Sequence, residues 1–298
     1  MNSAQTREVS CAGDVGHSNL PEKKYHLREF CLIQIMSEWN ASGYQAVSSL
    51  QEAMATEQLA RVTLGARDRV LDIGCGNGKI TAAIASRIPE GFVLGVDPSQ
   101  NMIAFAREHY DSAAHPNLRF ELCDARNLTY AQEFDRVVSF NAIHWVPEQA
   151  AVLRSIRSAL KPDGQALLRF VPEGARKCLE DVIEDVCRLP QWAHYFEARQ
   201  KPYVHPVPEA YRALAEENGL KVLQLEVEDK AWDFGSRQAF FDFCHVTFAE
   251  WTRFLPETEW TAFITEVLDR YQPIAASTPA ENDVFKFYQM EVVLTPVQ

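Results

Sequence analysis

The sequence has little of what membrane, secreted and nucleic-acid-binding proteins require. No run of about 18 uninterrupted apolar residues is present, and residues 1–24 contain no apolar signal-peptide core, so we expect neither a membrane span nor secretion. The seven cysteines form no C-x-x-C pair, which argues against a disulfide framework and favours a reducing cytoplasm. The 41 acidic residues outnumber the 29 basic ones, and the formal net charge of −12 disfavours nucleic acids and anionic membranes as partners.

What is present describes a globular α/β chain. The 298 residues are 47% hydrophobic and 11% aromatic, enough to bury a sizeable core, which excludes a mainly disordered or fibrous protein. Short β-rich runs alternate with helical stretches, a pattern typical of βαβ units and a mostly parallel sheet with helices on both faces. We expect strands at 69–73, 91–96, 118–122, 134–140 and 165–171, and helices at 79–87, 101–109 and 149–160.

The chain is organised around this core, which we place at residues 66–172. Residues 1–24 are polar and unpatterned and are predicted to be a flexible arm. Helices at 25–39 and 44–63 make up an N-terminal segment, 25–65, that covers the active site. Residues 173–298 are predicted to form a helical, aromatic-rich substrate cap and the last strands of the sheet, with helices at 175–187, 208–218, 236–248 and 257–271 and strands at 221–227 and 285–294.

The sharpest local signal is Arg69-Val-Leu-Asp-Ile-Gly-Cys-Gly-Asn-Gly-Lys-Ile80. Glycines 74, 76 and 78 follow a buried strand and precede a helix, where the backbone must turn tightly and approach a ligand closely. A dinucleotide fingerprint needs a further glycine where this chain has Lys79, so nicotinamide and flavin cofactors are disfavoured. The next strand ends in Asp97, which is well placed to accept both hydroxyls of a ribose.

Five motifs resemble the class I S-adenosylmethionine-dependent methyltransferases over residues 66–172. They are Val70-Leu-Asp-Ile-Gly-Cys-Gly-Asn-Gly78, Gly95-Val-Asp-Pro-Ser99 with Met102, Cys123-Asp124-Ala125, Phe134-Asp-Arg-Val-Val-Ser-Phe140 and Leu160-Lys-Pro-Asp-Gly164. The resemblance implies a Rossmann-like, seven-stranded sheet, S-adenosylmethionine as methyl donor and S-adenosylhomocysteine as product. Asp163 departs from the family, in which many members have glycine at that turn, but aspartate tolerates turn conformations.

By the same resemblance, the glycine loop passes along the methionine part of the cofactor and Asp97 holds its ribose. Met102 would pack on the adenine, and Asp124 would accept a hydrogen bond from the exocyclic amine. The cofactor-binding residues implied are Asp72, Gly74, Cys75, Gly76, Asn77, Asp97, Pro98, Met102, Cys123, Asp124, Ala125 and Asn141.

The acceptor site is expected where the fourth strand ends, because in this family that strand end faces the transferred methyl group. Asn141, His144 and Trp145 lie there, and Tyr44, Ser48 and Gln51 share one face of the helix predicted at 44–63. Together these segments resemble the carboxyl methyltransferases, which include trans-aconitate, insect juvenile hormone acid and, more distantly, plant salicylate-type enzymes. The resemblance implies that Gln51 and Trp145 donate hydrogen bonds to a substrate carboxylate while His144 shapes the site.

Three functions remain open from sequence. The first is methyl ester formation on a small acid, and the aromatic residues after position 190 favour a lipophilic or aromatic one; Arg169, Arg176, Lys177 and Arg199 are the cations that could favour a polyacid instead. The second is methylation of carbon, nitrogen or a hydroxyl with His144 as base. The third is a non-catalytic S-adenosylmethionine-binding protein.

We expect no metal, because the adjacent Cys244 and His245 point in different directions on their predicted helix. A small-molecule substrate, a monomer or homodimer and a cytoplasmic location complete these expectations.

Overall fold

The computed structural model describes residues 48–111 and 113–298, and of residues 48, 49, 51, 52 and 280 it describes the backbone alone. All of these residues belong to one compact unit, Met36–Gln298. The predicted arm at 1–24, the predicted helix at 25–39 and Tyr44 lie outside the described residues. No helix within the described ranges is long and apolar enough to cross a bilayer.

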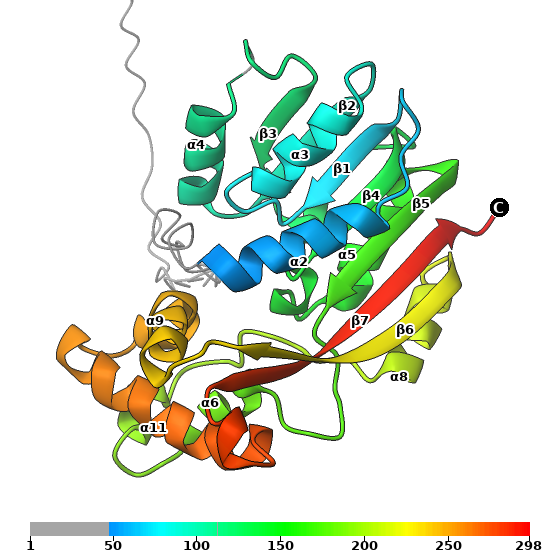
Figure 1. Cartoon of the computed structure of the whole chain (residues 1–298). Helices are drawn as coiled ribbons and strands as arrows, with labels where there is room; N and C mark the ends of the chain where they lie inside the picture. Colours follow the sequence, from blue (N-terminus) through cyan, green and yellow to red (C-terminus); the bar gives the residue numbers. More distant parts are fainter. Residues whose placement is uncertain (1–47, 112) are drawn as a thin grey trace, which may run out of the picture. The chain divides into compact units, whose positions relative to one another are not determined.

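A seven-stranded sheet with the order β3-β2-β1-β4-β5-β7-β6 forms the centre of the structure (Figure 1). Neighbours among β1 to β5 run parallel, whereas β7 runs antiparallel to both β5 and β6. The predicted mostly parallel α/β sheet is therefore confirmed. The strands are β1 (Arg69–Ile73), β2 (Phe92–Asp97), β3 (Leu118–Leu122), β4 (Phe134–Phe140), β5 (Leu160–Phe170), β6 (Leu220–Asp233) and β7 (Val284–Pro296).

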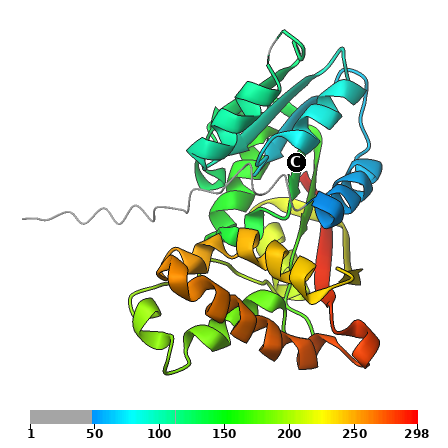
Figure 2. The same cartoon turned by 60° about the vertical axis from the view of Figure 1, so that its left-hand side comes forward.

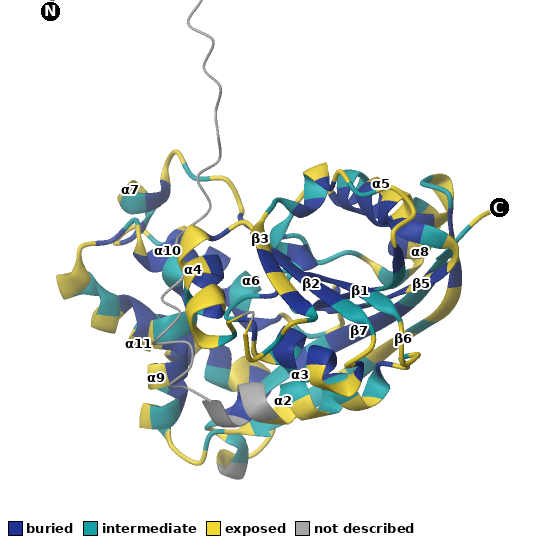
Figure 3. Ribbon diagram, turned by 90° about the horizontal axis from the view of Figure 1, so that it is seen from above, coloured by how far each residue is buried: buried dark blue, intermediate teal, exposed yellow. Residues whose placement is uncertain are grey.

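The central strands are apolar on both faces because helices cover both. In β1, Val70 belongs to one buried cluster and Leu71 to another, as successive side chains of a strand point to opposite faces. In Figure 1, α2 (Ser48–Arg61) and α3 (Lys79–Arg87) lie in front of the sheet and α5 (Gln149–Ala159) and α8 (Pro208–Glu217) behind it. Figure 3 shows the resulting buried layer of strands between helices whose outer faces are exposed.

A second hydrophobic core lies in the segment that follows β5. Its helices are α6 (Leu179–Cys187), α7 (Ala193–Phe196), α9 (Arg237–Thr247), α10 (Ala249–Thr252) and α11 (Glu257–Ala275), grouped in Figure 2 beside the ends of β6 and β7. Aromatic residues dominate it, so the predicted helical and aromatic cap is confirmed as a packed cluster: Trp192, Tyr195, Phe196, Tyr203, Trp232, Phe240, Phe241, Phe243, Phe248 and Trp251.

The remaining elements are α4 (Gln100–His109) and the short 3-10 helices η1 (Ala125–Asn127), η2 (Ile143–Trp145) and η3 (Pro279–Glu281). The Ser99 hydroxyl accepts a hydrogen bond from the Met102 N–H and caps the start of α4.

Several boundaries predicted from sequence differ from those of the structure, and three of the differences have a clear physical setting. The helix expected from residue 175 begins at Leu179, after an irregular segment. The strand expected at 221–227 extends to Asp233, because pairing with β7 outweighs the low strand propensity of its charged residues. The turn expected at 161–164 is instead a bulge within β5, where the register passes from Phe134↔Leu160 to Arg136↔Gln165.

Candidate active site

The loop after β1 is shaped by glycines in the left-handed region. Gly74 and Gly76 have φ values of 73° and 54°. The Gly74 and Cys75 N–H groups donate to the Val96 carbonyl at 2.8 and 3.0 Å, which pins the loop to the end of β2. A Cβ on Gly74 would lie 2.1 Å from the Ala142 Cβ, whereas one on Gly76 would meet no atom of the described residues within 4 Å. The loop is therefore closed on its Gly74 side and open beside Gly76, where a ligand has room to approach.

Asp97 lies at the end of β2 beside this open side. Its Oδ2 accepts the Gly76 N–H at 3.0 Å and its Oδ1 accepts the Ser99 N–H at 2.9 Å. Pro98, which follows, is exposed. These two backbone bonds fix the carboxylate at the carboxyl end of the parallel strands, the edge at which such sheets bind ligands.

Asp72 lies behind the loop. Its side chain is 2% exposed, and its Oδ2 accepts a hydrogen bond from the Thr81 hydroxyl at 2.7 Å. Burial, together with the nearby charge of Asp97, raises the pKa of Asp72 to about 7. The carboxyl group thus links β1 to the first turn of α3, and the Asn77 Oδ1 accepts the Lys79 N–H at the same helix start.

The end of β3 completes this edge. The Cys123 N–H donates to the Asp97 carbonyl at 3.1 Å, and Asp124 caps η1. The Asp124 carboxylate is bound by Arg126, with Nη2 at 2.6 Å from Oδ2. Burial alone would raise the pKa of Asp124, but the hydrogen bonds from Arg126 outweigh it and the pKa lies below its usual value. Met102 and Ala125 are both buried close to these strand ends.

At the end of β4 the backbone is strained. Asn141 has a φ of 54°, a conformation that residues other than glycine seldom adopt. Its N–H donates to the Arg169 carbonyl at 2.7 Å, and its Oδ1 accepts a hydrogen bond from the buried Gln289 Nε2 at 2.7 Å. Two partners from β5 and β7 therefore hold the turn that leads the chain into η2.

His144 is neutral and buried. It is 3% exposed, and its Nδ1 has no hydrogen-bond partner among the described residues. Burial, with a smaller contribution from His205, holds the pKa of His144 well below its usual value, so the imidazole carries no charge at pH 7. The His205 ring lies 6.1 Å away, centroid to centroid.

Trp145 stands beside two other aromatic rings. The centroids of Tyr203 and Trp251 lie 6.1 and 5.8 Å from that of Trp145, both nearly edge-on. The Trp251 indole N–H donates to Glu184 at 2.8 Å, and the Tyr203 hydroxyl donates to Asp181 at 3.0 Å. The rings beside Trp145 are therefore held by hydrogen bonds to α6.

Helix α2 approaches the same aromatic cluster at its beginning. Leu50 is buried in that cluster and Met54 packs against it, as does Trp145. Ser48 and Gln51 lie in this part of α2, but their side chains are outside the description, as is all of Tyr44.

Comparison with known proteins shows which family and which relatives this chain resembles. The family described as "Methyltransferase domain" matches residues 70–164. The chain is 28% identical to trans-aconitate 2-methyltransferase of Shigella dysenteriae over 243 residues, covering 80% of this chain and 92% of the relative. It is 27% identical to protein 235L of Invertebrate iridescent virus 6, covering 81% and 88%.

Among solved structures, phosphoethanolamine N-methyltransferase 2 of Haemonchus contortus, in complex with phosphomonomethylethanolamine and S-adenosylhomocysteine, shares the fold. Its TM-score is 0.57 at 18% identity, covering 87% of this chain and 57% of that one. Together these findings support a class I S-adenosylmethionine-dependent methyltransferase. They likewise support S-adenosylmethionine as the methyl donor.

Sequence patterns did not reveal how the methyltransferase anchors α2 to the sheet. The contacts form an ionic network of three acidic and three basic side chains from α2, β5, β6 and β7: Glu57, Arg61, Arg169, Glu228, Lys230 and Glu291. The available signal was the alternation of Glu226, Glu228 and Lys230, which places these side chains on one face of a strand.

Arg169 is the most deeply buried member of this network. It is 1% exposed, and its Nη2 lies 2.9 Å from Glu57 of α2. Burial alone would raise the pKa of Glu57, but Lys230 and Arg169 outweigh it and the pKa is lowered, so the carboxylate is ionised at pH 7. Arg169, expected as a cation that could reach the acceptor pocket, is thus occupied in holding α2.

Proposed function

We propose that the methyltransferase transfers the methyl group of S-adenosylmethionine to the carboxylate of a lipophilic or aromatic acid, forming a methyl ester. The observation that carries this proposal is the state of His144. It lies in η2, shortly after β4, where it is buried and neutral, and its lowered pKa makes it a weak proton acceptor. A carboxylic acid requires no such acceptor, because its pKa of about 4 leaves it ionised at pH 7.

The reaction then needs placement rather than proton transfer. A carboxylate oxygen attacks the methyl carbon, the carbon–sulfur bond breaks, and its electron pair stays on sulfur, so no proton is released. Gln51 and Trp145 are the proposed donors to the carboxylate, since an amide and an indole N–H orient it without protonating it. Ser48 and Tyr44 would line the acceptor pocket, as the family resemblance implies, and His144 would shape its floor.

The pairing of the four cations named in the sequence analysis favours one carboxylate over several. Arg176 is bound to Asp229 at 2.6 Å, Lys177 to Asp185 at 2.5 Å and Arg199 to Glu184 at 2.6 Å. Arg169 is held by the network described above. Because each already has a carboxylate partner within the protein, recognising a second or third substrate carboxylate would require breaking an ion pair. The aromatic rings around Trp145 favour an apolar body for the acid.

The trans-aconitate 2-methyltransferases among the relatives take their name from an acid, which supports a carboxylate acceptor.

The cofactor end fits S-adenosylmethionine. The open space beside Gly76 and the fixed Asp97 carboxylate suit a ribose next to a backbone loop. When bound, the cofactor supplies an electrophilic methyl group.

Residues of the four strand ends would hold that cofactor in the roles the family resemblance implies: Asp72, Gly74, Cys75, Gly76, Asn77, Asp97, Pro98, Met102, Cys123, Asp124, Ala125 and Asn141.

A labelled-methyl screen tests the proposal. The full chain is incubated with methyl-labelled S-adenosylmethionine and pooled fatty, isoprenoid, aromatic, dicarboxylic or tricarboxylic acids, and the products are then treated with base. We expect label released by base, as an ester requires, from the lipophilic or aromatic pools. Base-stable label would contradict the proposal and point to a carbon, nitrogen or phenol acceptor, and preference for the tricarboxylic pool would contradict the monoacid.

A further inference from the structure

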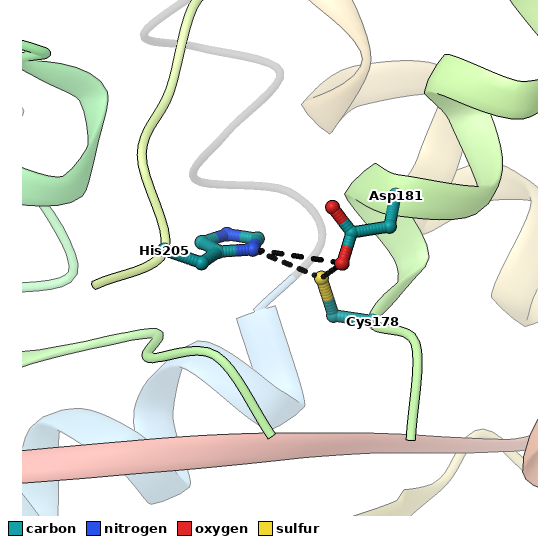
Figure 4. A group of neighbouring side chains, drawn as sticks. All are labelled: Cys178, Asp181 and His205. Carbon is teal, nitrogen blue, oxygen red and sulfur yellow. Dashed lines mark hydrogen bonds and ion pairs between the residues drawn. The ribbon is translucent and has the colours of Figure 1, made fainter. Parts of the chain in front are cut away.

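A group of three side chains of different chemistry meets at the start of α6, apart from the residues assigned to methyl transfer. Cys178 precedes α6, Asp181 lies in its first turn, and His205 comes from the segment before α8 (Figure 4). The Cys178 Sγ lies 3.0 Å from the Asp181 Oδ2 and 3.1 Å from the His205 Nδ1, and these last two atoms are 3.8 Å apart. We propose that these three residues bind a zinc ion.

Hydrogen bonds alone do not satisfy the group. The thiol has one hydrogen to give to either Asp181 or His205. If Asp181 takes it, the His205 Nδ1 must donate to sulfur, a weak acceptor. If His205 takes it, sulfur and carboxylate oxygen face each other at 3.0 Å with no hydrogen between them. In both cases the His205 Nε2 remains buried without a partner among the described residues.

A divalent ion resolves this conflict at the thiol. Zinc binds sulfur at about 2.3 Å and nitrogen or oxygen at about 2.0–2.2 Å, which places tetrahedral ligand atoms about 3.4–3.6 Å apart. The observed separations lie within about half an ångström of that range, so small side-chain rotations suffice. A thiolate, a carboxylate and a neutral imidazole together carry two negative charges, which a zinc ion neutralises.

The surroundings support a ligand set. The Asp181 Oδ1, the oxygen turned away from sulfur, accepts the Tyr203 hydroxyl at 3.0 Å and lies 3.4 Å from the Lys201 ammonium. Such outer contacts orient metal-binding carboxylates. Cys178, Asp181 and His205 also line a cavity of about 240 Å³ beside the loop at 172–177, which leaves room for water as a fourth ligand.

The ion would act near the acceptor site without touching it. The His205 ring lies 6.1 Å from that of His144 and 4.4 Å from that of Tyr203, which in turn packs on Trp145. Zinc would therefore join the start of α6 to the segment that supports these aromatic rings. This site does not depend on the carboxylate acceptor, because it stands whichever small molecule is methylated.

Cobalt titration tests the site on the full chain. The purified protein is treated with a chelator, dialysed, and titrated with Co²⁺, which reports thiolate ligation by a charge-transfer band and four-coordination by intense visible bands. We expect both at one equivalent, with Zn²⁺ displacing Co²⁺. Cys178→Ala and His205→Ala are expected to weaken binding by at least about 100-fold, because each removes a direct ligand. Cys187→Ala, which removes a buried cysteine at the other end of α6, is the matched control and should bind as the wild type does.

Two results would overturn the proposal. One is a wild-type chain that binds less than one equivalent or shows no thiolate band. The other is unchanged binding in Cys178→Ala and His205→Ala, which would place an adventitious ion elsewhere. Should either variant fail to fold by circular dichroism, alkylation of the wild type decides: Zn²⁺ must protect Cys178 from a thiol reagent, as shown by peptide mass spectrometry, and unprotected Cys178 refutes the site.

Discussion

The two ends of the proposed active site are built differently. The cofactor end consists of strand termini and a glycine loop, and its contacts are largely backbone N–H groups bound to Val96 and Asp97. The acceptor end consists of side chains from α2 and η2, which are supported by aromatic packing, ion pairs and the hydrogen bond between Tyr203 and α6. Backbone geometry tolerates little change of residue type, whereas side-chain walls can be exchanged, so the first end suits a fixed cofactor and the second a variable substrate.

Adding a methyl group to the loop should have the largest effect. Gly74→Ala places a Cβ 2.1 Å from the Ala142 Cβ in a left-handed conformation, and we expect a loss of about 4 kcal/mol or more in the free energy of unfolding. Gly76→Ala, which meets open space, should cost only about 1 kcal/mol. Urea unfolding measures both, and equal losses would show that the loop is not closed on its Gly74 side.

Asp72 should make the cofactor end sensitive to pH. Its folded pKa of about 7 exceeds the unfolded value of 3.8, so its contribution to stability is complete below about pH 4 and is lost as pH rises to 7, by up to about 4 kcal/mol. Asp72→Asn keeps an acceptor for Thr81 and removes the titration. Urea unfolding at pH 4.5, 6 and 7.5 should show the variant gaining stability relative to wild type as pH rises; parallel curves would contradict a raised pKa.

Breaking the ionic network should weaken binding of the acceptor and leave binding of the cofactor nearly unchanged. Arg169→Met leaves Glu57 and its neighbours with two cations instead of three, and we expect about 3 kcal/mol of destabilisation and a higher KM for the acceptor. The affinity for S-adenosylmethionine, measured by calorimetry, should stay within about threefold. Adding Glu57→Gln should restore part of the stability, since it removes one unpaired charge. Equal losses of acceptor and cofactor binding would show that the two ends are not separable.

Replacing Asp97 should have the reverse effect and weaken binding of the cofactor while leaving binding of the acceptor nearly unchanged. Asp97→Ala removes the acceptor of the Gly76 and Ser99 N–H groups and the proposed ribose ligand, so we expect S-adenosylmethionine to bind about 100-fold more weakly. The KM for the acceptor at saturating cofactor should change little. Asp97→Asn keeps one acceptor oxygen, so its affinity for S-adenosylmethionine should lie between those of Asp97→Ala and the wild type.

Replacing His144 should have the smallest effect of these changes, and that effect should fall on kcat. With a carboxylic acid as acceptor, His144→Gln should lower kcat by less than about tenfold, because no proton is transferred and the buried ring only shapes the site. Steady-state rates with saturating cofactor measure this. A loss of about 1,000-fold or more would identify His144 as a base and overturn the carboxylate proposal.

Much of the cofactor end could be predicted because its determinants are contiguous. Strand, glycine loop and helix follow one another from Arg69 to Arg87, and the strand at 69–73 and the helix at 79–87 have the bounds expected from sequence. The bounds of β6 could not be predicted in the same way, because its charged residues are stabilised by pairing with β7, a strand more than 50 residues further along the chain.

Basic residues are few in this sequence, and in the fold the ones that could have bound an acidic substrate are already paired. Sequence alone determined an acidic α/β chain with a glycine loop, an acid after the second strand and the motifs of a methyltransferase, because each of these is written within a few neighbouring residues. Only the tertiary structure decided that Arg169, Arg176, Lys177 and Arg199 are paired, that His144 is neutral, and that Cys178, Asp181 and His205 meet. Pairing, burial and ligand geometry depend on distances between residues far apart in the chain, and packing alone sets those distances.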